Sequence, residues 1–362
     1  MAQQHHEMTG TGTGPGGDAG ELLAAHLQAQ ATEFLRALRV HRESTTDAQG
    51  AEEALEAARA LRRAARRIGA TLHTFRPLLD PEWATSLRPE LAWLSGTLAQ
   101  EHAYATRLDR LLDSLHRLSG QPPVPPPAVE TAVGSRSAGR NGWAQPPVQG
   151  AHTEAGTPRG LAVGAAKAAA LLERQLTLAR TRAHSTALQA FGSSRFHAVA
   201  DNVAVLASEV PLRGTGEDLK PLAAQAESDL TEAVSALPLG QAGHPYNAGA
   251  LVHGLASDTA PDAQDAPWLK VRSLLRLHRY AQEVLLGHAG QDPRITEASH
   301  ALNVHREAAA AAAAAAHAAR TPRIAPATAY ALGVLHADQR HEVEAARFAF
   351  QQAWLHEAVS TR

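Results

Sequence analysis

Arginines gather on one face of a predicted helix at residues 51–76. At about 100° per residue, spacings of three, four and seven place most of the basic side chains of this segment together. Leu61 and Ile68 fall on the opposite face, and no acidic residue occurs between Ala57 and Leu79. The basic side chains are Arg59, Arg62, Arg63, Arg66, Arg67 and His73. Guanidinium groups without acidic partners repel one another, and their paired N–H donors suit phosphate oxygens.

A second basic stripe lies at residues 268–285. Its members are Lys270, Arg272, Arg276 and Arg279, and the first acidic residue after them is Glu283. The three arginines share one helix face, while the leucines at 274, 277 and 285 face away. If the two helices pack around a groove, the stripes could form one basic channel. Such a channel would suit a linear polyanion better than a single phosphate ion.

The two stripes are also compatible with a protein that binds no anion. Glu52, Glu53 and Glu56 precede the arginines of the first stripe, an order that the helix dipole favours by itself. The arginines could also pair with carboxylates of neighbouring helices, in a scaffold whose partner is a protein or a storage granule. Geometry separates these alternatives, because a binding surface requires the stripes to converge with few carboxylates within about 4 Å.

The composition predicts an all-α fold. Of 362 residues, 44% are hydrophobic but only 4% are aromatic, so the core must consist mainly of Ala, Leu and Val. Ala and Leu favour helices because they lose little side-chain freedom there. The chain has no cysteine, which excludes disulfides and thiolate metal sites and favours a reducing, cytoplasmic location. No secretory signal is visible at the N-terminus.

Changes in composition predict four regions. Residues 1–20 are rich in Gly, Thr and Gln and are predicted to be a disordered tail. Residues 21–120 carry the periodicity of helices, residues 121–160 are a Pro- and Gly-rich linker, and residues 161–359 are helical again. The pattern after Trp83 fits one long helix or two. Helix breaks are expected near 211–216, 238–249, 257–267, 287–293 and 321–326.

The sequence carries no catalytic or metal-binding signature. It lacks a Walker-type loop, a dinucleotide fingerprint, a nucleophile elbow and an acidic cluster for Mg²⁺, so we expect a protein that is not an enzyme. The 20 His residues show no H-E-x-x-H or similar pair, and we expect no metal and no cofactor. No apolar run is long enough to predict a membrane span. The net charge of −2 and the lack of aromatic stacking platforms disfavour nucleic acid as a partner.

Five short motifs follow one another along the chain. Residues 58–69 read A-R-A-L-R-R-A-A-R-R-I-G, and residues 269–283 read L-K-V-R-S-L-L-R-L-H-R-Y-A-Q-E. The others are L-R-P-E-L-A-W-L at 87–94, S-S-R-F at 193–196 and L-N-V-H-R-E at 302–307. Taken in their order along the chain, the five motifs resemble those of the CHAD family, the conserved histidine α-helical domain. Arg59 stands where the first family signature has its His, and Leu269 stands where the second has its own.

The resemblance covers about residues 21–358 and implies a fold and a function. The implied fold is two four-helix bundles with approximate internal two-fold symmetry. The implied function is non-enzymatic binding of inorganic polyphosphate on a basic central surface, and the alternative is a scaffold that has lost this binding. The candidate polyanion-binding residues are Arg59, Arg62, Arg63, Arg66, Arg67, His73, Lys270, Arg272, Arg276 and Arg279.

Overall fold

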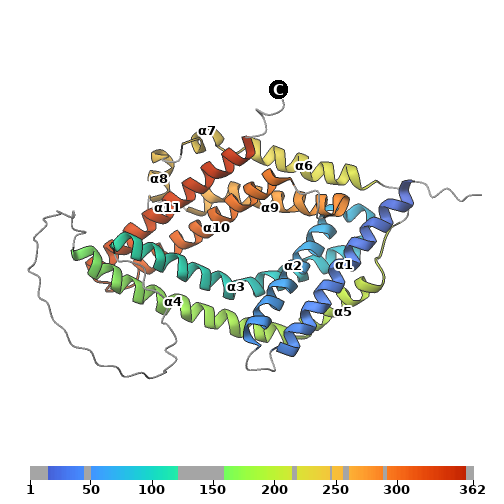
Figure 1. Cartoon of the computed structure of the whole chain (residues 1–362), viewed down its shortest axis with the longest axis horizontal. Coiled ribbons are helices and arrows are strands. Elements are labelled where there is room, and N and C mark those ends of the chain that lie inside the picture. The colour runs from blue at the N-terminus through green and yellow to red at the C-terminus, as the bar shows by residue number, and fades with distance from the viewer. Residues whose placement is uncertain are drawn as a thin grey trace, which may run out of the picture.

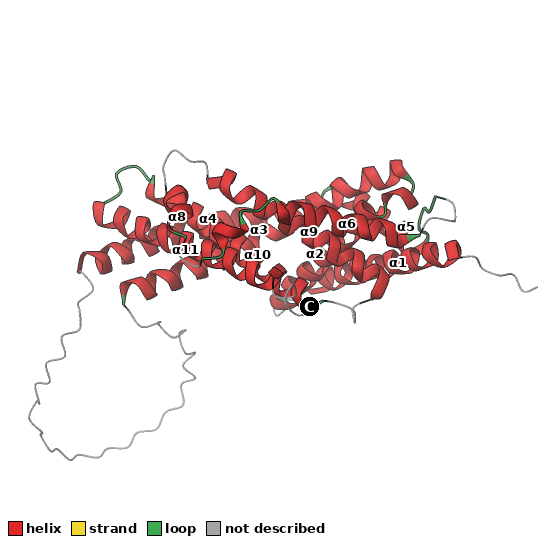
Figure 2. Ribbon diagram, turned by 90° about the horizontal axis from the view of Figure 1, so that it is seen from above, coloured by secondary structure: helices red, strands yellow, loops and turns green. Residues whose placement is uncertain are grey.

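All regular elements in the described part of the chain are helices (Figure 2). The computed structural model describes residues 15–44, 50–120, 159–213, 218–244, 247–255, 261–287 and 292–355. The helices there are α1 (Pro15–Ser44), α2 (Ala51–Thr74), η1 (Arg76–Leu78), α3 (Pro81–Ser119), α4 (Arg159–Phe191), α5 (Ser194–Ser208), α6 (Leu219–Ser235), α7 (Leu239–Ala242), α8 (Ala248–Leu255), α9 (Pro261–Leu286), α10 (Pro293–Ala319) and α11 (Pro326–Leu355). The prediction of an all-α fold is confirmed.

The segment after Trp83 forms one helix rather than two. Helix α3 begins after Asp80, whose carboxylate accepts a hydrogen bond of 2.8 Å from the backbone N–H of Trp83. It continues through Pro89 and ends at Gly120, whose φ of 68° lies in the left-handed region that glycine adopts without strain. A single helix of 39 residues can therefore contribute to cores at both ends of the molecule.

The helix breaks in the second half differ from the expected ones at three places, one of which is the short helix α7 inside the break expected at 238–249. The break expected at 257–267 ends early, because α9 begins at Pro261 and includes Pro267. A further break separates α4 from α5, where the Ser193 hydroxyl accepts a hydrogen bond from the backbone N–H of Phe196. This serine acts as an N-cap, a local signal that the apolar periodicity of the region does not reveal.

Two of the predicted regions lie mainly outside the described residues. They are the N-terminal tail at 1–20 and the linker at 121–160. Helix α1 begins within the first of these ranges, at Pro15, and helix α4 begins within the second, at Arg159. The internal two-fold symmetry implied by the family resemblance stays a prediction.

Three clusters of buried apolar side chains hold the helices together. The first joins α1, α2, the first half of α3 and α5 around residues such as Phe34, Ile68 and Phe196. The second joins α6, α9, α10 and α11 around Trp268, and the third joins the end of α3 to α4, α10 and α11. The first and third clusters both combine side chains from the two sides of the stretch 121–158, so the two halves of the sequence share cores.

The helices that carry the basic stripes meet near the middle of the molecule. In Figure 1, α3 and α4 run side by side, α10 and α11 form a second pair, and α1, α2 and α5 gather at one end. Helix α2 contacts α9, and α3 contacts α10. This arrangement places the stripes of α2 and α9 next to each other and flanks them with α3 and α10.

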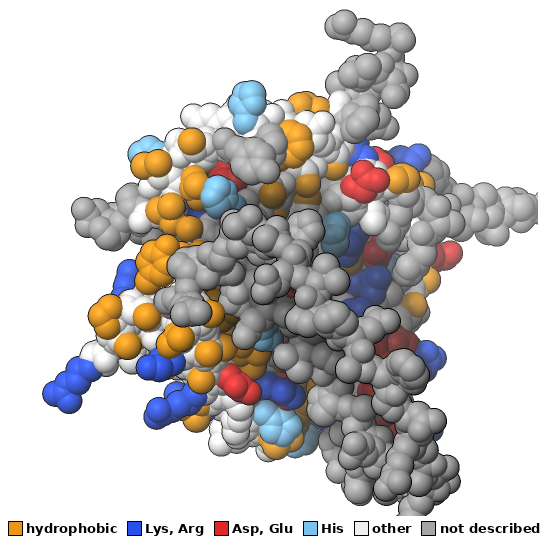
Figure 3. Space-filling view, turned by 60° about the vertical axis from the view of Figure 1, so that its left-hand side comes forward, with side chains coloured by type: hydrophobic (Ala, Val, Ile, Leu, Met, Phe, Trp, Pro, Cys, Tyr) orange, Lys and Arg blue, Asp and Glu red, His pale blue; other side chains and the backbone are white. Residues whose placement is uncertain are grey.

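A space-filling view shows how charged and apolar side chains are distributed on one face of the molecule (Figure 3). On the face seen in Figure 3, apolar side chains cover a large area and Lys and Arg side chains lie scattered among and beside them. None of the helices in the described ranges is long and apolar enough to cross a membrane.

Helix α10 is fixed against α11 by an alanine-rich contact. Small side chains at spacings of three and four let two helix backbones approach closely. The buried alanines of this run are Ala308, Ala311, Ala312, Ala315 and Ala318. Three of them, Ala311, Ala315 and Ala318, belong to one apolar cluster with Leu332 and Leu335 of α11. The run thus acts as a packing element, and it fixes the position of the helix that carries Arg306.

Enlarging one of these alanines should destabilise the fold. We expect Ala311→Leu to lower the free energy of unfolding by about 1–3 kcal/mol, because the extra atoms have no space beside α11. Ala313 lies in the same run but is exposed, so Ala313→Leu should leave stability nearly unchanged. Urea unfolding followed by circular dichroism measures both. Equal stability of the two variants would contradict the close packing of α10 on α11.

Candidate polyanion-binding groove

Two connected cavities between α2, α3, α9 and α10 form a groove, called here the central groove. Their volumes are about 290 Å³ and about 530 Å³, and both are lined by Arg62, Arg66, Arg272 and Arg306. The basic residues that line one or both cavities are Arg62, Arg66, Arg88, Arg107, Arg110, Arg272, Arg276, Arg306, His73 and His102. Among the described residues that line them, Glu307 is the one carboxylate. The groove is therefore strongly cationic although the whole chain is not.

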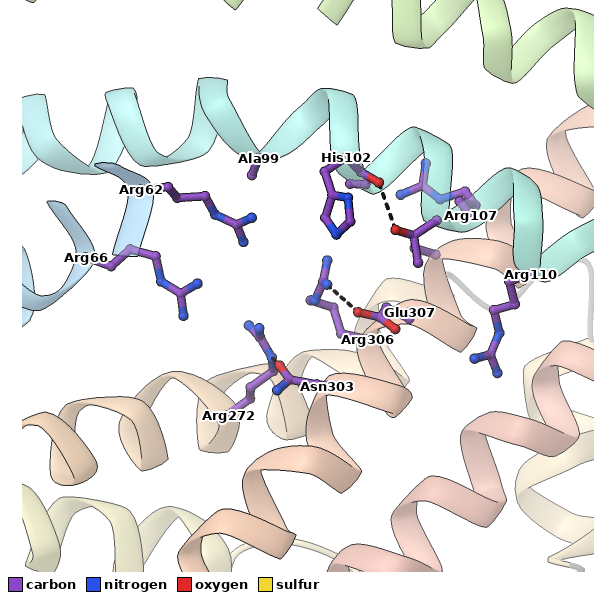
Figure 4. A pocket seen from close by; sticks show the side chains of 13 residues that line it. Arg62, Arg66, Ala99, His102, Arg107, Arg110, Arg272, Asn303, Arg306 and Glu307 are labelled. Carbon is purple, nitrogen blue, oxygen red and sulfur yellow. Dashed lines mark hydrogen bonds and ion pairs between the residues drawn. The ribbon is translucent and has the colours of Figure 1, made fainter. Parts of the chain in front are cut away.

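Helices distant in the sequence contribute the side chains that meet in this groove. Figure 4 shows four arginines from three helices that extend into a common space, with His102 of α3 on the opposite side. These arginines are Arg62 and Arg66 of α2, Arg272 of α9 and Arg306 of α10. The stripes of α2 and α9 thus converge on one surface, which α3 and α10 complete.

The arginines at the centre of the groove are not neutralised. Within the described residues, Arg62, Arg66, Arg272 and Arg276 have no carboxylate within ion-pair distance. Arg272 Nε donates to the side-chain oxygen of Asn303 at 2.9 Å, and Arg276 donates to the Ser273 hydroxyl at 3.3 Å, so both meet neutral acceptors. The Nε of Arg66 and of Arg306 is buried and has no hydrogen-bond partner among the described residues.

Burial and mutual repulsion disfavour these charges. Burial, followed by the charges of Arg306, Arg276 and Arg66, lowers the pKa of Arg272 to about 9. Burial and the charges of Arg66 and Arg306 lower the pKa of Arg62 to about 10. Both groups stay protonated at neutral pH. The groove therefore keeps its positive charge, although burial and mutual repulsion raise the free energy of the unliganded protein; this cost is called strain here. A multiply charged anion would relieve that strain.

The comparison with known proteins agrees with this arrangement. The CHAD domain family matches residues 29–295, most of the chain. The chain belongs to the CHAD family. It is also similar to a solved structure, "PptA from Streptomyces chartreusis", with 60% identity, a TM-score of 0.73, and coverage of 93% of this chain and 99% of that one. No curated protein matched the chain.

The CHAD domain places five of the ten residues predicted from the sequence in the central groove. They are Arg62, Arg66, His73, Arg272 and Arg276. Arg59 and Arg63 share Glu56 of their own helix, at 3.3 Å and 2.9 Å. Arg67 and Arg279 lie 2.8 Å and 4.0 Å from the buried carboxylate of Glu283, and Lys270 is exposed and lines neither cavity.

Ion pairing thus divides each stripe into a groove part and a structural part. The link between Arg67 of α2 and Glu283 of α9 joins the two helices. Burial opposes the charge on Arg67, but the hydrogen bond from Arg67 to Glu283 outweighs it and raises the pKa of that guanidinium. Arg67 and Arg279 also approach the face of Tyr280, at 5.6 Å and 5.0 Å from the ring centroid. This cluster holds the two basic stripes next to each other.

Sequence reasoning missed several groove residues of the CHAD domain. They are Arg88, His102, Arg107, Arg110, Asn303 and Arg306. None of them belongs to either predicted stripe, since acidic residues such as Glu101, Asp109 and Glu307 stand close to them in the sequence. Arg306 lies within the motif at 302–307, which was the one available signal for it. Within the described residues, no group of three His, Asp or Glu side chains is arranged to hold a metal ion.

Removing one groove charge should stabilise the unliganded CHAD domain. We expect Arg272→Gln to raise the free energy of unfolding by about 1 kcal/mol in a buffer without polyvalent anions, because repulsion from Arg66, Arg276 and Arg306 falls. Thermal unfolding measures this change. Arg36→Gln is the control, since Arg36 is exposed and paired with Glu33, and its melting temperature should not rise. A lower melting temperature for Arg272→Gln would contradict the proposed strain.

Anion binding in the groove should strengthen as the pH falls. Burial and the charges of Arg59 and Arg62 lower the pKa of His102, and burial with Arg88 and Arg76 lowers the pKa of His73. Both are neutral at pH 7 in the free protein. A bound anion should raise the pKa values of both histidines, because it favours their charged forms. The affinity for the anion should therefore be highest where both histidines are protonated in the complex, and it should fall as the pH rises through the raised pKa values.

Binding measured between about pH 7.5 and pH 5.5 tests this linkage. We expect wild-type affinity for a polyvalent anion to increase across that range. The His73→Ala/His102→Ala variant should show a flatter profile, with its affinity at the higher pH little changed. An identical pH profile for the two proteins would exclude these histidines from the site.

Proposed function

We propose that this CHAD domain binds inorganic polyphosphate, a linear polyanion, along the central groove and does not transform it. The observation that carries the proposal is the convergence of Arg62 and Arg66 of α2 with Arg272 and Arg276 of α9, none of which has a carboxylate partner among the described residues. Membership of the CHAD family supports the same ligand. We also propose a cytoplasmic location, which the cysteine-free sequence supports.

The charge in the groove favours a chain of phosphates over a single phosphate. Eight arginines line the two cavities, whereas a single orthophosphate carries too little charge to balance them. The two cavities adjoin each other, because Arg62, Arg66, Arg272 and Arg306 line both. A linear polyphosphate carries negative charge on every unit and could contact successive guanidinium groups along this path.

The same residues support binding without hydrolysis. Enzymes that transfer phosphoryl groups hold Mg²⁺ with carboxylates beside the phosphates. Among the described residues lining the groove, Glu307 is the one acid, and Arg306 donates to it at 3.0 Å. The groove offers many donors for phosphate oxygens but, among these residues, no cluster of acidic ligands and no activated nucleophile. We therefore propose a role in holding or localising polyphosphate.

The alternative of a scaffold that has lost this binding accounts for fewer of the observed contacts. In a pure scaffold, the arginines of both stripes would be paired with acids of neighbouring helices. Such pairing occurs for Arg67 and Arg279 at Glu283, and for Arg59 and Arg63 at Glu56. Among the described residues, it also occurs for Arg306 at Glu307 and for Arg110 at Glu342, but not for Arg62, Arg66, Arg272 and Arg276.

The experiment is a titration with long-chain polyphosphate at several salt concentrations. The groove variant is Arg62→Ala/Arg66→Ala/Arg272→Ala/Arg276→Ala. The matched control removes four exposed arginines outside the groove, in Arg36→Ala/Arg39→Ala/Arg117→Ala/Arg174→Ala, so that both variants have the same net charge. Circular dichroism establishes that each variant remains helical.

We expect the wild type and the control to bind, with an affinity that falls as salt increases. The groove variant should lose most of its affinity, and any remaining binding should show a salt slope shallower by roughly 3, because four phosphate contacts are missing. Equal losses in the two variants would point to nonspecific attraction. No binding by the folded wild type at low salt would reject polyphosphate as the ligand and favour the scaffold.

A further inference from the structure

A second cavity of about 500 Å³, called here the side cavity, adjoins the central groove. It lies between α2, α3, α4 and the C-terminal end of α1. Arg62 and His102 line both the side cavity and the groove, so the two spaces meet at these side chains. A ligand could therefore occupy both at once, with one part in each.

The side cavity differs from the groove in its apolar lining. Leu55 and Leu188 line it and are 41% and 52% exposed, although large apolar side chains on this protein are mostly buried. Leu98 and Phe191 add to the same wall, and the ring of Phe191 lies 4.4 Å from the ring of His41 at an angle of 30°. Phe191 also packs against the Phe196 ring at 5.1 Å, so Leu55 and Leu188 are the most exposed apolar side chains of this wall.

Polar groups that line the side cavity disfavour a purely aliphatic ligand. Glu101 accepts a hydrogen bond from His184 at 3.0 Å and lies 3.8 Å from Arg180. Its carboxylate oxygens could also accept from the amino group of a ligand. An alkyl chain would bury these polar groups without satisfying them, at a free-energy cost, whereas a nucleobase has both an apolar face and polar edges.

We propose that the side cavity binds the base of a nucleoside polyphosphate whose phosphate chain passes Arg62 and enters the central groove. The base packs against the exposed side chains of Leu55 and Leu188, beside the rings of Phe191 and His41. Arg62 contacts the first phosphates, because it lines both spaces. This inference rests on the proposed function, since the groove must bind the phosphates. It adds a second ligand class that competes with inorganic polyphosphate.

Calorimetry on the full chain, without magnesium, compares adenosine triphosphate with inorganic tripolyphosphate. The two compounds have three phosphates each, and the inorganic one carries more negative charge. Binding through the groove alone would favour tripolyphosphate or show no preference. If the base is bound, adenosine triphosphate should bind roughly tenfold more tightly, because its base is removed from water in the side cavity. Long-chain polyphosphate should displace it, because both ligands need Arg62.

Two double variants locate the base. Leu55→Gln/Leu188→Gln makes the wall of the side cavity polar without changing the charge. Leu22→Gln/Leu178→Gln is the matched control, because these leucines are 41% and 49% exposed and do not line the side cavity. The first variant should lose the preference for adenosine triphosphate and keep its affinity for tripolyphosphate. The control should behave as the wild type does.

Each outcome decides a separate point. Equal affinity for the two ligands in the wild type overturns the inference and leaves polyphosphate binding intact. A preference that both double variants retain places the base elsewhere and also overturns it. If neither tripolyphosphate nor long-chain polyphosphate binds the folded protein, the proposed function itself fails.

Discussion

Repulsion between like charges governs how the centre of this molecule is built. Two unit charges 4 Å apart interact by about 4 kcal/mol near a protein surface, so a cluster of unpaired arginines must be held together by other contacts. Here burial and neighbouring guanidinium groups lower the pKa values of Arg62 and Arg272. Favourable contacts elsewhere in the fold offset this repulsion, and an anion bound in the groove would reduce it.

Ion pairs beside the groove and deeper in the molecule hold its helices together against this repulsion. Glu283 lies between Arg67 and Arg279 and joins α2 to α9 where the two stripes meet. Deeper in the molecule, burial disfavours the ionised form of Asp265, but hydrogen bonds from His305 and Arg340 outweigh it and lower its pKa to about 2. Asp265 also accepts a hydrogen bond of 2.6 Å from Arg347, so one carboxylate connects α9 with α10 and α11. Removing a single member of such a buried network would leave an uncompensated charge.

The sequence predicted the helical class because Ala and Leu dominate the apolar residues, and it predicted the stripes because helical spacing is regular. It could not separate groove arginines from structural ones. Arg66 and Arg67 are neighbours on α2, yet Arg66 faces the groove and Arg67 binds Glu283, which is 216 positions away. Similarly, the motif at 302–307 marked the segment of Arg306 but not its role, which comes from its position opposite α2 and α3.

Local information was enough to establish that the chain is helical, where most helices break, and that two of them carry arginine on one face. These properties follow from local propensity and from a period of 3.6 residues, which act within a few turns. The tertiary structure decided which charges are neutralised, which helices complete the groove, and that an apolar cavity adjoins it. Those outcomes depend on distances between residues far apart in the chain, because a charge is balanced only by groups that packing brings within a few ångströms.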